Sequence, residues 1–127
     1  MFKLDSKSKL MNNKDIGNFG ENMAAKYLTE QGFEILFSNW RYKHLEIDLI
    51  ACKNGRLHIV EVKTRSGIEF GYPEQHIHKS KMQFLKNAAA FFQYEHPEWK
   101  YLQFDVVSIF LNQEKQWELL FIEDVYF

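Results

Sequence analysis

The segment HLEIDLIACKNGRLHIVEVKTR, residues 44–65, constrains the fold more than any other part of the chain. Two short apolar runs flank Asn54-Gly55, a dipeptide that favours a two-residue type I′ hairpin loop. Such a loop fixes the pairing register, so Asp48 is expected opposite Glu61 on the neighbouring strand. The sequence therefore predicts a β-hairpin that carries ionisable side chains among residues of a sheet core.

Side chains alternate between the two faces of a strand, which gives this hairpin one apolar and one mixed face. The mixed face is predicted to be apolar near the turn and charged at its far end, where Glu46 is expected opposite Lys63. The other face is expected to pack on a helix and to hold Ile47, Leu49, Ala51, Val60 and Val62.

The rest of the chain predicts an α/β domain. Apolar residues at spacings of three and four indicate helices, and short runs rich in β-branched and aromatic residues indicate strands. Residues 1–16 are expected to be a flexible tail, and residues 17–127 a single domain. The expected elements are a helix at 17–31, a strand at 33–41, the hairpin, a loop at 66–76, a helix at 79–94, and strands at 102–110 and 116–122. This order predicts a layered domain with a mixed sheet.

Composition excludes several classes of protein. A hydrophobic fraction of 46% is that of a globular chain, and the single cysteine, Cys52, cannot form an intrachain disulfide. The N-terminal residues lack the apolar core of a secretory signal, and no segment approaches the roughly 18 apolar residues of a membrane helix. A cytoplasmic protein without a membrane partner is therefore expected.

Charge is unevenly distributed along the chain. Residues 1–94 carry 14 basic and 10 acidic residues, whereas residues 95–127 carry 2 basic and 7 acidic residues. This distribution permits a local phosphate-binding surface, although ordinary solvated faces would explain it equally well.

The predicted Asp48–Glu61 pair requires compensation, because like charges directly opposite on neighbouring strands, roughly 5 Å apart, are destabilising. Lys63 is one candidate partner. A divalent cation is the other, since Mg²⁺ and Mn²⁺ prefer oxygen ligands and the backbone carbonyl of Val62 could supply a further one. A lysine beside such a site could act on water or on charge that develops on a phosphate. The alternative is a solvent-facing cluster of salt bridges without metal.

The same residues resemble the PD-(D/E)XK nuclease signature, written here as D-x12-E-V-K. The chain also contains, in order, GNFGENMAAKYLTEQGFEIL, EIDLIA, VEVKTRSG, GYPEQHIHKSKMQFLKNAAAF and FDVVSI. Together these segments resemble the YraN-like proteins, a largely uncharacterised bacterial family related to archaeal Holliday-junction resolvases. The resemblance covers residues 17–127. It implies a restriction-endonuclease-like three-layer fold, in which helices flank a mixed sheet, and a bacterial, cytoplasmic origin.

The resemblance also implies roles for particular residues. Asp48 and Glu61 match the metal-binding acids, and Lys63 matches the catalytic lysine. Glu21 matches a glutamate that reaches the site from the first helix, although without the resemblance a plain surface glutamate explains it as well. Glu46 matches the acid of a G-E-I-D element and is expected to support the site or add a ligand.

Three further residues are candidates for substrate contacts, and one position departs from the family. Gln75 is expected near the site, as polar residues are in related nucleases, or is simply a loop residue. Arg65 and Lys81 are expected to contact phosphates of DNA, although the Lys81 head group could equally extend to solvent. Leu45 stands where the family usually has glycine, and could narrow the site.

The predicted function is that of a metal-dependent nuclease that hydrolyses phosphodiester bonds of DNA in a branched or structured form, with Mg²⁺ or Mn²⁺ as cofactor. Two alternatives stay open. One is a nucleic-acid-binding module with the nuclease fold and little or no turnover, and the other is a protein-interaction adaptor. A homodimer is a further expectation, because branched-DNA resolvases commonly act as dimers.

Overall fold

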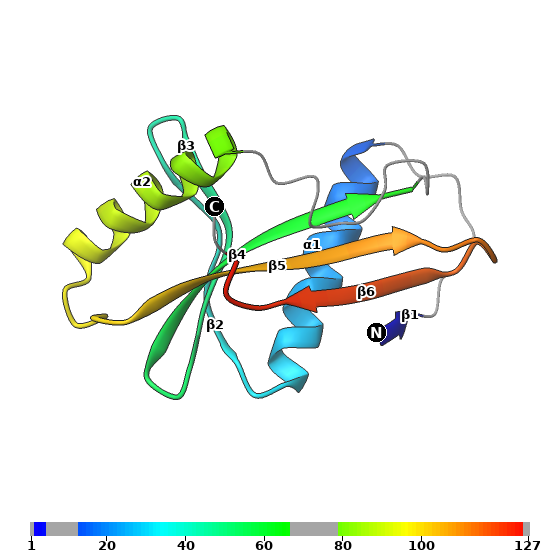
Figure 1. Cartoon of the computed structure of the whole chain (residues 1–127), viewed down its shortest axis with the longest axis horizontal. Helices are drawn as coiled ribbons and strands as arrows, with labels where there is room; N and C mark the ends of the chain where they lie inside the picture. Colours follow the sequence, from blue (N-terminus) through cyan, green and yellow to red (C-terminus); the bar gives the residue numbers. More distant parts are fainter. Residues whose placement is uncertain (1, 5–12, 67–78, 126–127) are drawn as a thin grey trace.

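The computed structural model describes residues 2–4, 13–66 and 79–125 (Figure 1). No helix in these ranges is long and apolar enough to cross a membrane. The predicted loop at 66–76 lies, except for Ser66, outside the described residues. The elements are β1 (Phe2–Leu4), α1 (Asn13–Glu30), β2 (Glu34–Tyr42), β3 (Leu45–Lys53), β4 (Arg56–Arg65), α2 (Lys79–Glu95), β5 (Leu102–Leu111) and β6 (Trp117–Ile122).

The strands form one mixed sheet in the order β1-β6-β5-β4-β3-β2. The central pair, β4 and β5, is parallel, and the other neighbours are antiparallel. A parallel pair needs a crossover connection, which α2 supplies between β4 and β5. The two helices pack on opposite faces of the sheet, each over its own hydrophobic cluster. The predicted α/β fold is confirmed, and the arrangement is consistent with a restriction-endonuclease-like domain.

The first helix ends at its predicted glycine stop, but it begins before the predicted first residue. Gly32 has a φ of 93°, and the amide of Phe33 donates to the carbonyl of Leu28 at 2.9 Å, which is a glycine-based helix stop. The helix begins at Asn13, four residues before the expected Gly17. Within the expected tail, Phe2–Leu4 pair with β6 as a short strand. The sequence of these residues carried no signal for that pairing, because the partner strand lies more than 110 residues away along the chain.

The hairpin forms in the predicted register. Asn54 and Gly55 both have positive φ, 54° and 76°, as a type I′ loop requires. The ladder between β3 and β4 then runs from Lys53–Arg56 to Leu49–Val60. The two pairs expected beyond it, Asp48–Glu61 and Glu46–Lys63, lie past the end of this ladder. Beyond the ladder β3 still pairs with β2, and β4 with β5, but β3 and β4 no longer pair with each other. There the Asp48 side chain connects the two strands.

One prediction about the hairpin faces was wrong. Leu49, Ala51 and Val60 pack under α1, as expected of a single apolar face. Ile47, which was assigned to the same face, packs instead in the α2 cluster beside Ile50. Strict alternation along β3 therefore fails between residues 47 and 49, at the position of Asp48. The prediction assumed a regular strand, whereas the strand changes face at this position.

A buried polar pair joins β4 to β5 inside the sheet. His58 Nδ1 lies 2.5 Å from Asp105 Oδ2, and the Asp105 side chain is fully buried. The other oxygen of Asp105 accepts hydrogen bonds from Gln103 Nε2 at 2.8 Å and from the backbone amide of Asp124 at 2.9 Å. Every oxygen of this buried carboxyl thus has a partner, which is the condition for a polar group to be tolerated in a core.

Candidate active site

A cavity of about 560 Å³ opens beyond the end of the β3–β4 ladder. It lies between the first turns of α1, the middle of β3 and the last residues of β4. Six of the site residues predicted from sequence line it. Among the described residues, the lining consists of Ile16, Gly17, Glu21, Asp48, Glu61, Val62, Lys63, Thr64, Arg65 and Ser66. The fold therefore gathers residues from three separate elements around one space.

Asp48 links the two strands where their backbone pairing has ended. Its Oδ2 accepts a hydrogen bond from the backbone amide of Val62 at 2.8 Å. This bond uses the Val62 amide. It does not involve the Val62 carbonyl, which is the backbone group that was predicted as a metal ligand. The same Asp48 carboxylate accepts a hydrogen bond from the protonated carboxyl of Glu61. The two acids are thus neighbours, as the hairpin register predicted. The Asp48 side chain, and not backbone pairing between β3 and β4, holds them together.

Glu61 is the most perturbed acid in the cavity. Only 4% of the residue is exposed. Burial, followed by the hydrogen bond to Asp48 and the charge of Asp48, raises the pKa of Glu61 to about 8, while Lys81 and Lys63 oppose the rise. The physical cause is that a carboxylate loses hydration inside the protein and meets a second negative charge. Glu61 therefore holds a proton at neutral pH unless a cation compensates the pair.

Glu21 reaches the cavity because α1 approaches β4 very closely at Gly20. A Cβ atom at Gly20 would overlap Thr64 Oγ1 and lie 2.9 Å from Thr64 Cβ, so a larger residue would push the helix away. Burial raises the pKa of Glu21, and the negative charge of Asp48 raises it further. The electrostatic contact between Glu21 and Asp48 places the helix glutamate in the same acidic cluster, as the resemblance implied.

Asn39 belongs to the site although the sequence reasoning missed it. Its side chain hydrogen-bonds the Glu21 carboxylate, which lowers the pKa of Glu21 against the effect of burial. The β2–β3 ladder is in register on both sides of Asn39 but skips the Asn39–Asp48 position, and Asn39 has a φ of 53°. An asparagine inside an otherwise strand-like run was the available signal, because asparagine is depleted in strands and tolerates positive φ.

Basic residues surround the buried acid from two elements. Lys81 Nζ lies 3.4 Å from Glu61 Oε2, and its side chain is 40% exposed. The Lys81 head group therefore faces the acidic cluster rather than extending to solvent. Lys63, half-buried on β4, is close enough to lower the pKa of Glu61. Arg65 lines the cavity at the end of the same strand, and its guanidinium donates to the Thr64 carbonyl at 3.3 Å.

Two other residues that the sequence singled out, Glu46 and Leu45, lie outside this arrangement. Glu46 forms an ion pair with Arg41 across β2 and β3, at 3.5 Å between Nη2 and Oε1, and is not among the residues that line the cavity. Its charge reaches Glu21 only as a weaker contribution to the raised pKa. Leu45 packs against the α2 cluster and does not narrow the cavity. Gln75 lies outside the described residues.

Comparison with known proteins places this chain among relatives over most of its length. The profile of "Uncharacterised protein family UPF0102" matches residues 20–109. The chain belongs to the UPF0102 family. A UPF0102 protein from Flavobacterium psychrophilum is 34% identical over 89% of this chain and 94% of its own length. The UPF0102 protein from Caldicellulosiruptor bescii is 42% identical over 80% of this chain and 87% of its own length. The UPF0102 protein from Natranaerobius thermophilus is 39% identical over 91% of this chain and 100% of its own length.

The family match spans the candidate site of this UPF0102 protein. Residues 20–109 include both acids of the hairpin, Asp48 and Glu61, as well as Glu21, Lys63 and Lys81. This confirms the resemblance to the YraN family that the sequence indicated. The match therefore covers every lining residue of the cavity from Glu21 to Ser66, and not an isolated motif.

The donor atoms of the cavity suit a hard divalent cation, although they do not form a complete cage. Asp48 and Glu61 are adjacent carboxyls, and the Val62 carbonyl follows directly in the chain. Among residues 2–4, 13–66 and 79–125, no three His, Cys, Asp or Glu side chains converge closely enough to hold a metal ion. Two carboxylates with water and substrate oxygens are a usual environment for Mg²⁺, so the residues present fit such an ion.

Proposed function

We propose that this UPF0102 protein is a metal-dependent nuclease that hydrolyses phosphodiester bonds of DNA, with branched or structured DNA as its substrate. The observation that carries the proposal is the hydrogen-bonded Asp48–Glu61 pair, in one cavity with Lys63. A carboxyl whose pKa is raised to about 8 beside a second acid is unfavourable for the fold alone. Perturbed acids in a cavity are typical of sites that bind or transform a ligand.

Each residue has a chemical task in this proposal. Asp48 and Glu61 supply oxygen donors for Mg²⁺ or Mn²⁺, and Glu61 must first release its proton. When bound, such an ion supplies a Lewis acid and lowers the pKa of a coordinated water. The Lys63 ammonium neutralises negative charge that forms on the phosphate as its P–O bond breaks. Glu21, held by Asn39, completes the acidic cluster on the side of α1.

The decisive experiment compares DNA binding with single-turnover cleavage. Single-stranded, duplex, flapped and four-way DNA are screened with Mg²⁺ and Mn²⁺ for wild type, Lys63→Ala and Asp48→Asn. Lys63→Ala should lower the cleavage rate roughly 100-fold or more and leave DNA binding largely intact. The reason is that the interaction of the Lys63 ammonium with the phosphate is stronger in the transition state than in the bound substrate. Asp48→Asn should weaken metal binding and cleavage together. Lys115→Ala is the matched control, since Lys115 is an exposed lysine on the turn between β5 and β6.

Two results would contradict the assignment in different ways. Cleavage by Lys63→Ala at the wild-type rate would show that the assigned mechanism is wrong. Wild-type protein that binds DNA and cuts none of these substrates with either metal would favour the alternative of a nucleic-acid-binding module.

Metal binding is testable without any substrate. A ligand that binds only the native state adds stability by mass action, so Mg²⁺ or Mn²⁺ should raise the Tm of wild type. The rise should be larger at pH 9 than at pH 6, because Glu61 keeps its proton below a pKa of about 8 and protons compete with the cation. Asp48→Asn should lose most of this effect. Equal shifts of Tm in both proteins would mean that these acids do not bind the ion.

A further inference from the structure

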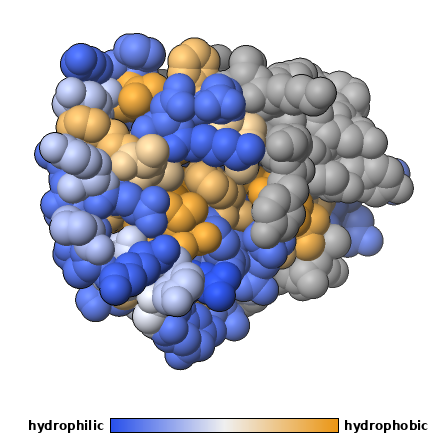
Figure 2. All heavy atoms as spheres, turned by 60° about the vertical axis from the view of Figure 1, so that its left-hand side comes forward, coloured by the Kyte–Doolittle hydropathy of each residue, from blue (hydrophilic) through white to orange (hydrophobic). Residues whose placement is uncertain are grey.

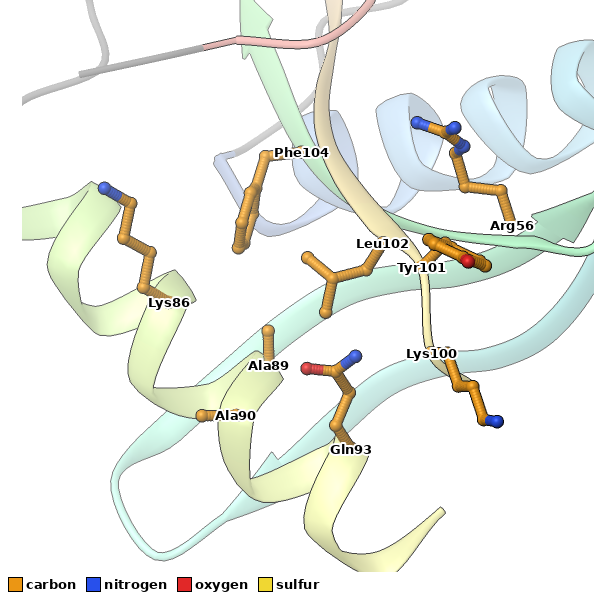
Figure 3. Close-up of a pocket in the computed structure, with 9 residues that line it drawn as sticks. All are labelled: Arg56, Lys86, Ala89, Ala90, Gln93, Lys100, Tyr101, Leu102 and Phe104. Atoms are coloured by element: carbon orange, nitrogen blue, oxygen red, sulfur yellow. The ribbon is translucent and has the colours of Figure 1, made fainter. Parts of the chain in front are cut away.

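A second hollow lies away from the acidic cavity, between the C-terminal half of α2 and the first residues of β5. Its volume is about 430 Å³. One wall is the α2 stripe from Lys86 to Gln93, and the other is the segment from Lys100 to Phe104. Figure 3 shows Ala89 on α2 and Leu102 and Phe104 on the β5 side, all pointing into the space between the helix and the sheet. We call this hollow the α2–β5 groove; its floor is apolar.

The rim of the α2–β5 groove is basic. Arg56, Lys86 and Lys100 line it, and none of the described lining residues is acidic. The Arg56 guanidinium donates to Gln103 Oε1 at 3.4 Å. Lys86 and Lys100 are exposed, and within the described part of the chain neither forms an ion pair. Figure 3 places these two lysines at opposite ends of the apolar floor. Because the whole chain has a net charge of −1, three basic residues without an acid are a local concentration of positive charge that attracts anions.

An exposed aromatic ring stands beside this charge. The Tyr101 residue borders the groove and is 67% exposed, and Figure 3 shows its ring on the opposite side of the β5 segment from Leu102 and Phe104, toward Arg56. Its backbone is held in place, because the Tyr101 carbonyl accepts a hydrogen bond from the Leu57 amide at 2.9 Å. Figure 2 turns this end of the molecule forward and shows apolar surface within a largely hydrophilic face. A basic groove with an aromatic side chain is the arrangement by which proteins bind single-stranded nucleic acid.

The α2–β5 groove is separated from the acidic cavity by a distance that a few nucleotides can span. Five residues of β4 separate Glu61 in the cavity from Arg56 at the groove, which is about 17 Å of strand. Five residues of α2 likewise separate Lys81, beside Glu61, from Lys86, or about 7.5 Å of helix. At 3.4 Å per stacked nucleotide, about five nucleotides cover the longer path. One strand of nucleic acid could therefore occupy both places at once.

We propose that the α2–β5 groove binds a single-stranded segment of nucleic acid next to the cleavage site. A base stacks on the exposed Tyr101 ring at the edge of the groove, and flanking phosphates contact Lys86 and Lys100. The inference rests on the proposed function only in that the same strand continues into the acidic cavity. An acidic protein segment would satisfy the lysines, but a planar ring beside every negative charge is a regular feature only of a nucleotide chain. The alternation of ring and charge in a nucleotide chain matches both features.

Base stacking is tested first. Binding of a labelled single-stranded oligothymidylate is measured by fluorescence anisotropy in EDTA, where no metal-dependent cleavage occurs. Tyr101→Ala should bind roughly 5- to 150-fold more weakly, and Tyr101→Phe should bind like wild type, because the ring and not the hydroxyl carries the contact. Tyr94→Ala is the matched control, since Tyr94 is 83% exposed on α2 and does not line the groove.

The charge contribution is tested by salt dependence. The double variant Lys86→Gln, Lys100→Gln should show a slope of log K against log salt that is shallower by about 1.4, since each phosphate contact on a single strand contributes about 0.7. Lys115→Gln should leave the slope unchanged. Failure of wild type to bind oligothymidylate, or wild-type binding by Tyr101→Ala, would overturn the proposal. Displacement of the oligonucleotide from the groove by polyglutamate at an equal charge concentration would overturn the nucleic-acid assignment.

The outcomes separate this inference from the proposed nuclease activity. If wild type cuts no DNA and the groove variants still bind oligothymidylate more weakly, the groove assignment stands and the catalytic one fails. If wild type cuts DNA and the groove variants bind and cut equally well, the catalytic assignment stands and the groove assignment fails.

Discussion

Replacing Glu61 with glutamine should make the protein more stable at alkaline pH and leave its stability near pH 4 almost unchanged. The Glu61 carboxyl is buried against Asp48, and in the folded protein its pKa is raised from 4.5 to about 8. Glutamine keeps the size and the hydrogen-bond donor of the protonated acid but cannot ionise. The variant therefore removes the titration and preserves the packing.

The sign and size of the effect follow from proton linkage. Below pH 4.5 Glu61 is protonated in both the folded and the unfolded chain, so it contributes no pH dependence. Between pH 4.5 and about 8 the folded chain keeps a proton that the unfolded chain has lost, and stability falls as pH rises. One pKa unit corresponds to 1.36 kcal/mol, so the full fall is about 5 kcal/mol, comparable with the whole stability of a small domain.

The measurement is a set of urea unfolding curves between pH 4 and pH 9 in EDTA. Wild type should lose stability over this range, whereas Glu61→Gln should be much flatter. Asp48→Asn should also be flatter, because the neighbouring charge that raises the pKa of Glu61 is gone. Glu114→Gln is the control at an exposed glutamate in the β5–β6 turn and should behave like wild type. Parallel curves for wild type and Glu61→Gln would refute the account of the buried pair.

Three further predictions concern residues that build or support the site. Gly20→Ala should destabilise the fold by about 1–3 kcal/mol in urea unfolding, because the added methyl group would overlap Thr64 of β4. Gly17→Ala is the control: a Cβ there meets nothing within 4 Å, so the variant should be neutral or stabilised by up to about 1 kcal/mol. Asn39→Gly keeps the positive φ but removes the amide, so the pKa of Glu21 should rise in a carboxyl NMR titration; an unchanged pKa would count against the contact. Asp105→Ala should cost about 3–5 kcal/mol in thermal or urea unfolding, since it leaves buried polar partners unpaired, and a loss below 1 kcal/mol would contradict that role.

Local sequence signals were sufficient for most of the fold. Periodicity located both helices, and the Asn54-Gly55 turn fixed the hairpin register as far as Leu49–Val60. These signals act over a few residues, where turn geometry and the burial of alternate side chains decide the structure. The short strand Phe2–Leu4 could not be predicted in this way, because its partner β6 is distant in sequence and three residues carry no pattern.

The sequence also determined which chemistry is available, since it places Asp48, Glu61 and Lys63 on one hairpin in a spacing that resembles known nucleases. Tertiary structure alone decided how these groups behave. The approach of α1 at Gly20 brings Glu21 to the hairpin, and α2 brings Lys81 within 3.4 Å of Glu61. Neither distance follows from spacing, because each depends on how a helix packs across the sheet. Burial by that packing, and the neighbouring charge it confines, are what raise the pKa of Glu61.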